Sequence, residues 1–293
     1  MAFLIETPFL LIGLIVFLFL VFEAFQNNWI QVSRYQIESK KVPLGFDGYR
    51  ICQLSDLHSK RFGKNHERLM RKIDQIKPDL IAITGDVMNN KGDDGAVFLD
   101  LLSKLTKYPC FYIIGNHEQF TTLWDEGFLP EYLNKIRKAG AVVLNNEKTV
   151  IKKGLDHINL YGMHIDLQYY RNMTKPKFRN VVFTKNHVKS TIGDSHQKEF
   201  NLLLTHNPLF FGAYADWGAD LVLSGHVHGG VIRIPSVGGL LSPERVFFPK
   251  YSEGVYTEGK SKMVVSRGLG NSTVNLRVFN RPEIVDIEIK HSV

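Results

Sequence analysis

Residues 221–230 read LVLSGHVHGG, an apolar run that stops at Ser224 and is followed by two histidines among three glycines. A short apolar run bounded by glycine is typical of a buried strand. Imidazole is the commonest metal-ligating side chain, and glycine permits a positive φ and a close approach of the backbone. Two histidines in a turn are also common as solvated residues. The stretch therefore predicts a metal site only if other strand ends supply further ligands.

The same pattern, an apolar run that ends in polar side chains, occurs at four earlier places in the chain. These runs end in SDLHS (55–59), TGDVMNN (84–90), GNHEQ (115–119) and LLTHNP (203–208). Residues 65–77 and 93–105, which lie between the first three runs, have the apolar spacing of amphipathic helices. This alternation predicts right-handed crossovers and a mostly parallel sheet within one α/β domain.

The carboxyl ends of parallel strands converge, and ligands of α/β proteins bind there. The predicted strand ends bring together carboxylates, an amide and imidazoles: Asp56, His58, Asp86, Asn116, His117, His206, His226 and His228. Oxygen donors mixed with imidazole, without thiolate, suit Mn, Fe, Zn, Co or Ni ions and disfavour a structural zinc site or copper(I). So many side chains exceed the needs of one ion with an open position, whereas two ions that share a bridging carboxylate fit the set.

The ordered motifs DLH, GD, GNHE, THNP and GHVHGG resemble those of the calcineurin-like metallophosphoesterase superfamily, over roughly residues 49–290. The apolar N-terminus and the stretch after the last motif resemble the bacterial membrane-associated branch of that superfamily. The resemblance implies an α/β fold, a four-layer αββα sandwich of two mixed β-sheets flanked by helices. It also implies an enzyme with two divalent metal ions that hydrolyses a phosphate ester or pyrophosphate bond by metal-hydroxide attack.

The resemblance further assigns a role to each side chain. It gives Asp56, His58 and His228 to one metal, Asn116, His206 and His226 to the other, and Asp86 to both as the bridge. His117 is not a ligand in this pattern but a group that faces the substrate. Because imidazole titrates in the useful range, His117 is expected to protonate the leaving oxygen as general acid.

The N-terminus contains the run FLLIGLIVFLFLVF at residues 9–22, which is apolar throughout. No Lys or Arg precedes the run and no small-residue cleavage site follows it, so an uncleaved anchor is favoured over a removed signal peptide. We expect an anchor over 1–27, a basic tether over 28–45 and the catalytic domain over 46–293. The basic residues Arg34, Lys40 and Lys41 after the run predict a cytoplasmic catalytic domain at the cell membrane.

The net charge of +7 suits a surface that faces anionic lipid or a phosphorylated substrate. Nucleic-acid binding is not expected, because no helix carries basic runs interleaved with aromatic residues. Cys52 and Cys110 lie in apolar runs, which favours two buried thiols over a disulfide. Nothing in the sequence determines the oligomeric state.

Two alternatives belong to other classes of protein. The first is a non-catalytic, membrane-tethered binding module on the same fold, and the retention of every expected ligand disfavours it. The second makes the membrane run the main functional element, with the soluble domain regulating a partner protein. Among enzymes, the superfamily includes monoesterases, diesterases and pyrophosphatases of lipid precursors. By analogy, the anchor favours a lipid-linked substrate that resembles a UDP-diacylglucosamine pyrophosphate.

Overall fold

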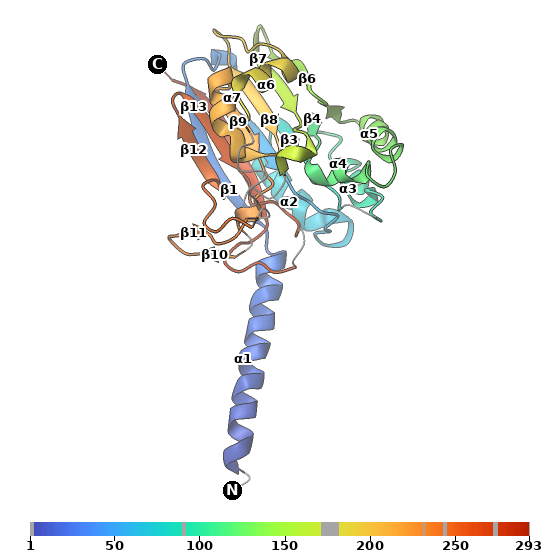
Figure 1. Cartoon of the computed structure of the whole chain (residues 1–293), viewed down its shortest axis with the longest axis vertical. Helices are drawn as coiled ribbons and strands as arrows, with labels where there is room; N and C mark the ends of the chain where they lie inside the picture. Colours follow the sequence, from blue (N-terminus) through green and yellow to red (C-terminus); the bar gives the residue numbers. More distant parts are fainter. Residues whose placement is uncertain are drawn as a thin grey trace.

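The structure is a computed structural model that describes residues 3–89, 92–170, 182–230, 232–242, 245–271 and 275–292. A rounded domain stands on one long helix, α1 (Phe3–Asn28), which projects from one end of it (Figure 1). Two six-stranded sheets form the centre of the domain. The described part of the chain therefore has the expected anchor-like helix followed by a mixed α/β domain.

The first sheet has the order β1-β14-β2-β3-β4-β5 and the second the order β12-β13-β9-β8-β7-β6. The strands of the first sheet are β1 (Gln31–Ser39), β14 (Glu283–His291), β2 (Tyr49–Leu54), β3 (Leu80–Thr84), β4 (Cys110–Ile113) and β5 (Val142–Val143). Those of the second are β12 (Gly254–Glu258), β13 (Ser261–Val265), β9 (Leu221–Ser224), β8 (Asn201–Thr205), β7 (Asp156–Met163) and β6 (Glu147–Lys153). In both sheets the strands that lead to the predicted ligands run parallel to one another.

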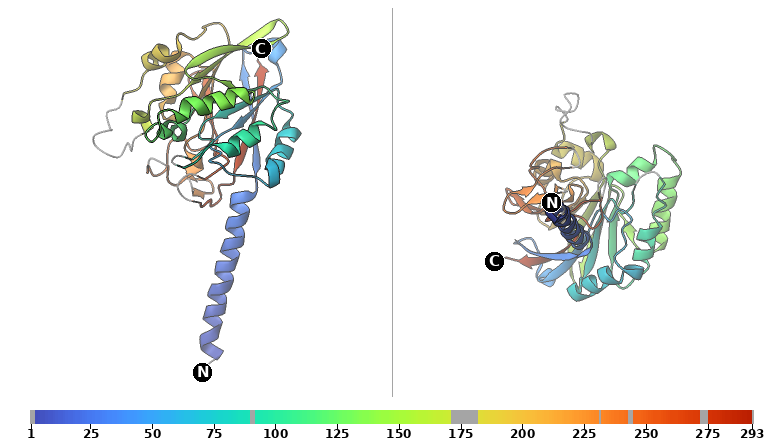
Figure 2. Two further views of the ribbon diagram at one scale, coloured as in Figure 1. Left: turned by 90° about the vertical axis from the view of Figure 1, so that its right-hand side faces the viewer. Right: turned by 90° about the horizontal axis from the view of Figure 1, so that it is seen from below.

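Helices cover the outer face of each sheet. On one side lie α2 (Glu67–Ile76), α3 (Ala96–Leu102), α4 (Asn116–Thr121) and α5 (Phe128–Lys138), and on the other lie α6 (Lys185–Ile192) and α7 (Phe211–Trp217). Seen from below, the cyan and green helices and the yellow and orange helices lie on opposite sides of the sheets (Figure 2). The resulting order of layers is α, β, β, α, as the resemblance implied.

Strand β3 is buried at every position and lies in the middle of its sheet, with a core on each face. Successive side chains of a strand point to opposite faces. Leu80 and Ala82 enter the core between the sheets, whereas Ile81 and Ile83 enter the core under α2, α3 and α5. A strand that is apolar at every position must be covered on both faces, and here each face has its own core.

The predicted helices exist but are shorter than their apolar patterns. The helix predicted over 93–105 begins at Ala96, because Asp93 and Asp94 accept hydrogen bonds from the backbone N–H groups of Gly95 and Ala96 and form a turn. The helix predicted over 65–77 is α2, which begins at Glu67 after His66 has taken a left-handed conformation. Cys52 and Cys110 are buried free thiols, as predicted.

The segment 28–45, expected as a basic tether, is instead part of the folded domain. It contains strand β1, which pairs in parallel with β14 over its whole length, from Gln31 opposite Glu283 to Ser39 opposite His291. No local feature of residues 28–45 indicates this pairing, because the partner strand β14 is far away along the chain. Helix α1 therefore joins the sheet directly, after only Trp29 and Ile30.

Helix α1 includes a stretch of 20 residues, Phe9–Asn28, that is long and apolar enough to cross a membrane. A signal sequence passes the same test of length and composition. Beside the domain end of α1 lies a two-stranded hairpin of β10 (Arg233–Ile234) and β11 (Gly238–Gly239) (Figure 1).

Candidate metal centre

The structure brings the predicted side chains together at one edge of the two sheets. Strands β2, β3 and β4 deliver five of the eight and strands β8 and β9 deliver the other three, each shortly after its strand ends. The seven predicted ligands are almost completely buried, with exposed fractions between 0% and 6%: Asp56, His58, Asp86, Asn116, His206, His226 and His228. Buried charged and imidazole groups in such numbers require mutual pairing or a cation.

One group of ligand atoms belongs to Asp56, His58 and His228, and these atoms all lie within 4.8 Å of one another. The Nε2 atoms of the two histidines are 3.1 Å apart, and that of His228 is 3.4 Å from Asp56 Oδ1. Burial lowers the pKa of His58 to about 3 and holds that of His228 well below its usual range. Both imidazoles are therefore neutral, with nitrogen lone pairs available to a cation.

A second group is formed by Asp86, His206 and His226, again within 4.8 Å. His206 Nδ1 lies 2.6 Å from the Thr84 carbonyl oxygen and donates to it, so Nε2 faces Asp86 Oδ2 at 3.1 Å. Burial alone would lower the pKa of His206, but the carboxylates of Asp86 and Asp56 outweigh it and raise the pKa to about 10. Two carboxylates and one imidazole nitrogen thus converge, since His206 Nε2 also lies 3.8 Å from Asp56 Oδ1.

Asn116 and His117 begin helix α4, next to Asp86. The Oδ1 atom of Asn116 is buried and has no hydrogen-bond partner among the described residues. The backbone N–H of His117 donates to Asp86 Oδ1 at 2.8 Å, and its Nε2 lies 4.0 Å from Asp86 Oδ2. The His117 side chain is 17% exposed, so it reaches from the buried ligands toward solvent.

The backbone at the ligands has a feature that the sequence did not reveal. Five of the seven predicted ligands have left-handed conformations, with φ between 45° and 72°: Asp56, His58, Asp86, His226 and His228. Non-glycine residues rarely adopt this region, and such outliers gather at functional sites. The turns are held by bonds between loops, such as those from the N–H groups of Asp56 to Gly85 O and of His58 to Asp86 O.

Glu118 is a residue of the site whose role the sequence reading missed, although it stands in the GNHE motif. Its buried carboxylate accepts hydrogen bonds from the backbone N–H groups of Asp86, Val87 and Gly115 at 2.7–2.9 Å. Burial and the charge of Asp86 raise the pKa of Glu118 to about 7. Glu118 thus ties the loop after β3 to the start of α4 and positions Asp86 beside His117.

Gly229 and Gly230, which follow His228, allow the close approach of the backbone that glycine permits. A Cβ atom on Gly229 would lie 2.4 Å from Asn280 Oδ1, and one on Gly230 would lie 2.6 Å from Gly239 Cα. Both glycines let the turn after β9 pack tightly against the protein.

The side chains present fit divalent cations. One group of donors consists of Asp56, His58 and His228, and the other consists of Asp86, His206 and His226. The amide oxygen of Asn116, which has no partner among the described residues, adds a further donor. Burial raises the pKa of Asp56 because its charge has lost most of its hydration. A cation would offset that cost, which is the usual condition for burying a carboxylate.

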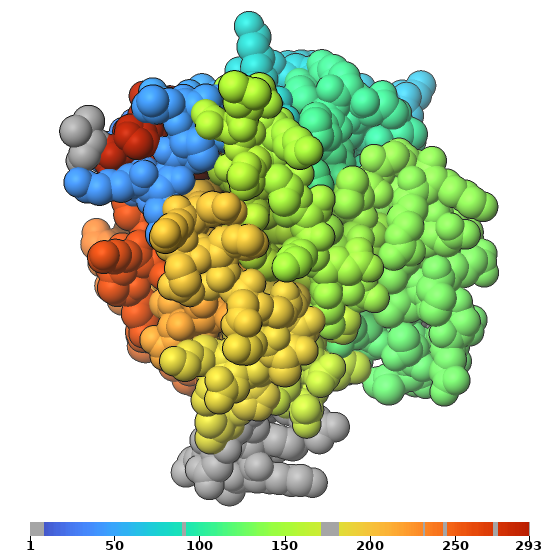
Figure 3. Space-filling view, turned by 90° about the horizontal axis from the view of Figure 1, so that it is seen from above, coloured from blue at the N-terminus to red at the C-terminus, as the bar shows by residue number. Residues whose placement is uncertain are grey.

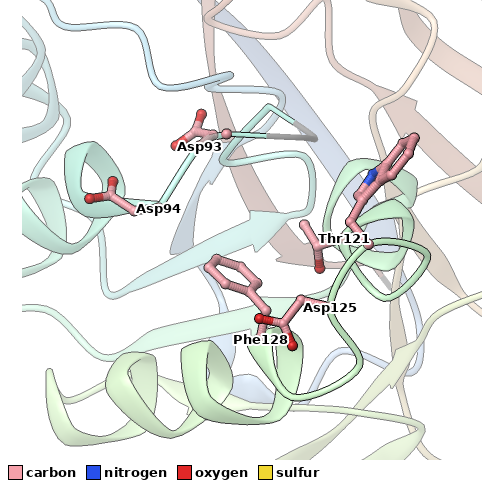
Figure 4. Close-up of a pocket in the computed structure, with 7 residues that line it drawn as sticks. Asp93, Asp94, Thr121, Asp125 and Phe128 are labelled. Carbon is pink, nitrogen blue, oxygen red and sulfur yellow. The ribbon is translucent and has the colours of Figure 1, made fainter.

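A separate cavity of about 300 Å³ lies near the other end of α4. Figure 4 shows Asp93 and Asp94 on one side of it and Thr121, Asp125 and Phe128 on the other. Its three carboxylates would repel an anionic group, so this cavity is a poor place for the phosphate of a substrate.

Known proteins resemble this chain over most of its length. The sequence profile of the family described as calcineurin-like phosphoesterase matches residues 49–230. Phosphodiesterase YaeI of Escherichia coli is 31% identical, over 90% of this chain and 90% of its own. Metallophosphoesterase YkuE of Bacillus subtilis is 28% identical over 90% and 87%, and UDP-2,3-diacylglucosamine pyrophosphatase LpxG of Chlamydia muridarum is 24% identical over 88% and 89%.

The matched range begins at the first residue of β2 and ends two residues after His228, so it spans every side chain of the centre described above. The chain belongs to the calcineurin-like phosphoesterase family and is a metal-dependent phosphoric ester hydrolase.

Proposed function

We propose that this enzyme works with two metal ions and hydrolyses a phosphate ester or pyrophosphate bond at the cell membrane. The position of Asp86 supports the proposal most directly. Its Oδ2 atom lies 3.1 Å from His206 Nε2 and 3.9 Å from His58 Nε2, so one carboxylate adjoins both groups of ligands. Asp86 would bridge the ions, with Asp56, His58 and His228 on one and Asn116, His206 and His226 on the other.

When bound, two divalent cations of the Mn, Fe, Zn, Co or Ni type neutralise phosphate oxygens and lower the pKa of water. The protein supplies the fixed positions. His206 is oriented through its bond to the Thr84 carbonyl, and Asp86 is held by the N–H of His117. Such outer bonds keep ligands in one orientation, and the bond to the Thr84 carbonyl also raises the basicity of the His206 ring.

His117 is the proposed general acid. Its ring lies edge-on to that of His58, with ring centroids 4.6 Å apart, and its side chain is the most exposed of the eight predicted site residues. A protonated imidazole here can give its proton to the leaving oxygen as the ester bond breaks. After the step, His117 is neutral and regains a proton from solvent.

A metal-content experiment tests the two-metal proposal. Purified enzyme loaded with manganese should approach two ions per chain and hydrolyse a generic aryl phosphate. Asp86→Asn should lose more metal than either His58→Ala or His226→Ala, because the bridge serves both ions. The matched control is Asp94→Asn, an exposed carboxylate outside the centre. Full metal content and activity in Asp86→Asn would overturn the two-metal proposal.

For the substrate, we propose a phosphate compound presented at a membrane, such as a lipid-linked pyrophosphate. The apolar helix α1 and the similarity to LpxG support this choice. The similarity to a phosphodiesterase supports a diester as the second candidate. A screen of the enzyme with manganese against soluble monoesters, diesters and UDP-diacylglucosamine in detergent distinguishes them by relative kcat/KM.

We also propose that α1 is an uncleaved single-pass anchor and that the catalytic domain, which includes strand β1, is cytoplasmic. The basic residues after the helix support this orientation. The alternative, a tethered module without catalysis, predicts no turnover on any phosphate ester together with capture of a partner protein.

A further inference from the structure

The domain end of α1 is fixed to the catalytic domain by polar contacts. The side chains of Phe9 to Val21 are half or more exposed, whereas Gln26 and Asn27 are buried. Asn271 Nδ2 donates to Asn27 Oδ1 at 2.8 Å, and Lys60 Nζ donates to the Asn27 carbonyl at 2.6 Å. Only Trp29 and Ile30 separate α1 from β1, so the helix cannot swing away from the end of the domain to which it is joined.

The strand register places the metal centre at that same end. Gln31, which starts β1, lies opposite Glu283 of β14. Val285 of the antiparallel β14 pairs with Gln53 of β2. Beyond this pair the loop 268–269 lies between the two strands, since Glu283 N donates to Gly268 O and Leu269 N donates to the carbonyl oxygen of Ser55, the residue before Asp56. Three strand spacings are about 15 Å, so the first ligand of the centre lies within roughly that distance of the residue where α1 passes into the sheet.

The loops beside α1 carry a group of exposed apolar side chains, which we call the apolar rim: Ile234, Val237, Phe247, Phe248 and Phe279. Their exposed fractions run from 39% to 66%. A chain of contacts ties these loops to the helix. Phe248 N donates to Leu240 O, Ile232 pairs with Val278, and the ring of Phe279 lies 5.5 Å from that of Phe22. In Figure 1 the β10–β11 loops stand beside the upper end of α1.

The exposed part of α1 ends where the rim begins. The unbroken run of exposed residues in α1, Phe9–Val21, stops one residue before Phe22, which contacts Phe279 of the rim. A helix that enters a bilayer with this run would bring the rim to the membrane surface. Two exposed basic residues, Arg245 and Lys250, lie on either side of Phe247 and Phe248 in the sequence. Apolar side chains beside Lys and Arg are typical of surfaces that enter the interfacial region of an anionic bilayer.

We propose that the apolar rim is a second membrane contact, seated in the lipid headgroup and upper acyl region next to α1. The occupant of this surface is the bilayer itself. The metal centre then opens at headgroup depth, so its substrate is an amphiphile whose phosphate lies in the headgroup layer while its acyl chains stay in the membrane. The proposal rests on α1 as an anchor, but not on catalysis.

Depth-dependent fluorescence quenching tests it on the full chain in nanodiscs that contain phosphatidylglycerol. A single environment-sensitive label is attached to Phe247→Cys, with Val237→Cys as a second rim variant. Cys52 and Cys110 are buried and escape labelling. The matched control is Leu155→Cys, an exposed apolar residue at the β6–β7 turn. Figure 3 looks onto this opposite end of the molecule, where β6 and β7 lie on the surface. A label at Phe17→Cys reports on α1.

We expect lipids brominated near the headgroup to quench the two rim labels several-fold more than the label at position 155. If the label at position 17 is quenched but the rim labels are quenched no more than the label at position 155, the rim does not contact the membrane. The assignment of α1 as an anchor would then still hold. If the rim labels become shielded from solvent only when more chains are placed in each nanodisc, the rim contacts another copy of this chain. That result would also overturn the proposal. None of these readings depends on turnover, so failure of the proposed reaction remains distinguishable.

Discussion

Five of the predicted ligands keep a left-handed backbone: Asp56, His58, Asp86, His226 and His228. The left-handed conformation costs each of them on the order of 1–2 kcal/mol relative to an ordinary conformation. The cost is borne because the loops brace one another. His226 N donates to Asp56 Oδ1, and Glu118 accepts from the backbone N–H of Asp86. These bonds between protein groups hold the backbone of the ligands, which favours binding of metals without a change of backbone.

Gly225 tests how tightly these loops pack. A Cβ atom at this position would lie 2.0 Å from Ser55 Oγ and 2.3 Å from Asp56 Oδ2. Gly225→Ala should therefore displace Asp56, lower the metal content and reduce kcat/KM by at least tenfold, which equals about 1.4 kcal/mol. Gly127→Ala is the matched control, because its Cβ would meet only Asp125 Oδ1 at 3.4 Å. Wild-type metal content in Gly225→Ala would contradict this account of the loop.

The role of His117 as general acid predicts a selective defect. His117→Ala should keep both metals but lose roughly 10²–10⁴-fold in rate on esters with poor leaving groups. With nitrophenolate, which needs little protonation, the loss should shrink. His226→Ala should impair both classes of substrate, because it removes a ligand. An equal loss on both leaving groups at unchanged metal content would leave His117 as a binding or orienting residue.

At the scale of elements, the last turns of α1 are part of the catalytic domain. Arg277, which is buried, donates to the carbonyl oxygens of the loop 267–270, and its backbone N–H donates to Glu23 Oε2 of α1. That loop supports the centre, since Gly270 N donates to the Asp56 carbonyl at 2.6 Å. The helix end and the first ligand are therefore linked through a single loop.

Two truncations separate anchoring from support. Removal of residues 1–21 should give an active domain, because Glu23, Gln26 and Asn27 remain. Removal of residues 1–27 deletes these contacts and should lower the free energy of unfolding by about 2–3 kcal/mol, since each lost hydrogen bond is worth about 1 kcal/mol. Urea unfolding and activity on an aryl phosphate measure both effects. Equal stability of the two truncated domains would show that the helix end only tethers.

The elements that sequence alone predicted are those whose cause is local. Apolar runs gave the strands, and the polar residues after them identified Asp56, Asp86 and His206 as neighbours in space. The left-handed turns could not be predicted, since they depend on bonds between separate loops. Strand β1 was missed for a similar reason: its largely polar sequence is permitted because it lies at the sheet edge beside β14.

At the scale of the whole molecule, the basic residues after α1 predict the orientation of the proposed anchor. The basic residues Arg34 and Lys41 pair with Asp286 and Asp220 in the folded domain, but they are unpaired while the chain is being inserted. The positive-inside rule acts at that stage and predicts a cytoplasmic domain. Protease added to intact cells should spare the domain and should digest it after permeabilisation. Digestion before permeabilisation would reverse the orientation.

The pairing of β1 with β14 also sets a timetable for biosynthesis. Strand β1 follows α1 directly, but its partner β14 is translated only about 250 residues later. At roughly 5–20 residues per second, the ribosome takes on the order of 10–50 s to supply it. During that interval the edge of β2 that β14 will cover stays open, and another nascent chain could pair with it. Synthesis of β14, rather than synthesis of β1, is then the event that commits each chain to its native sheet.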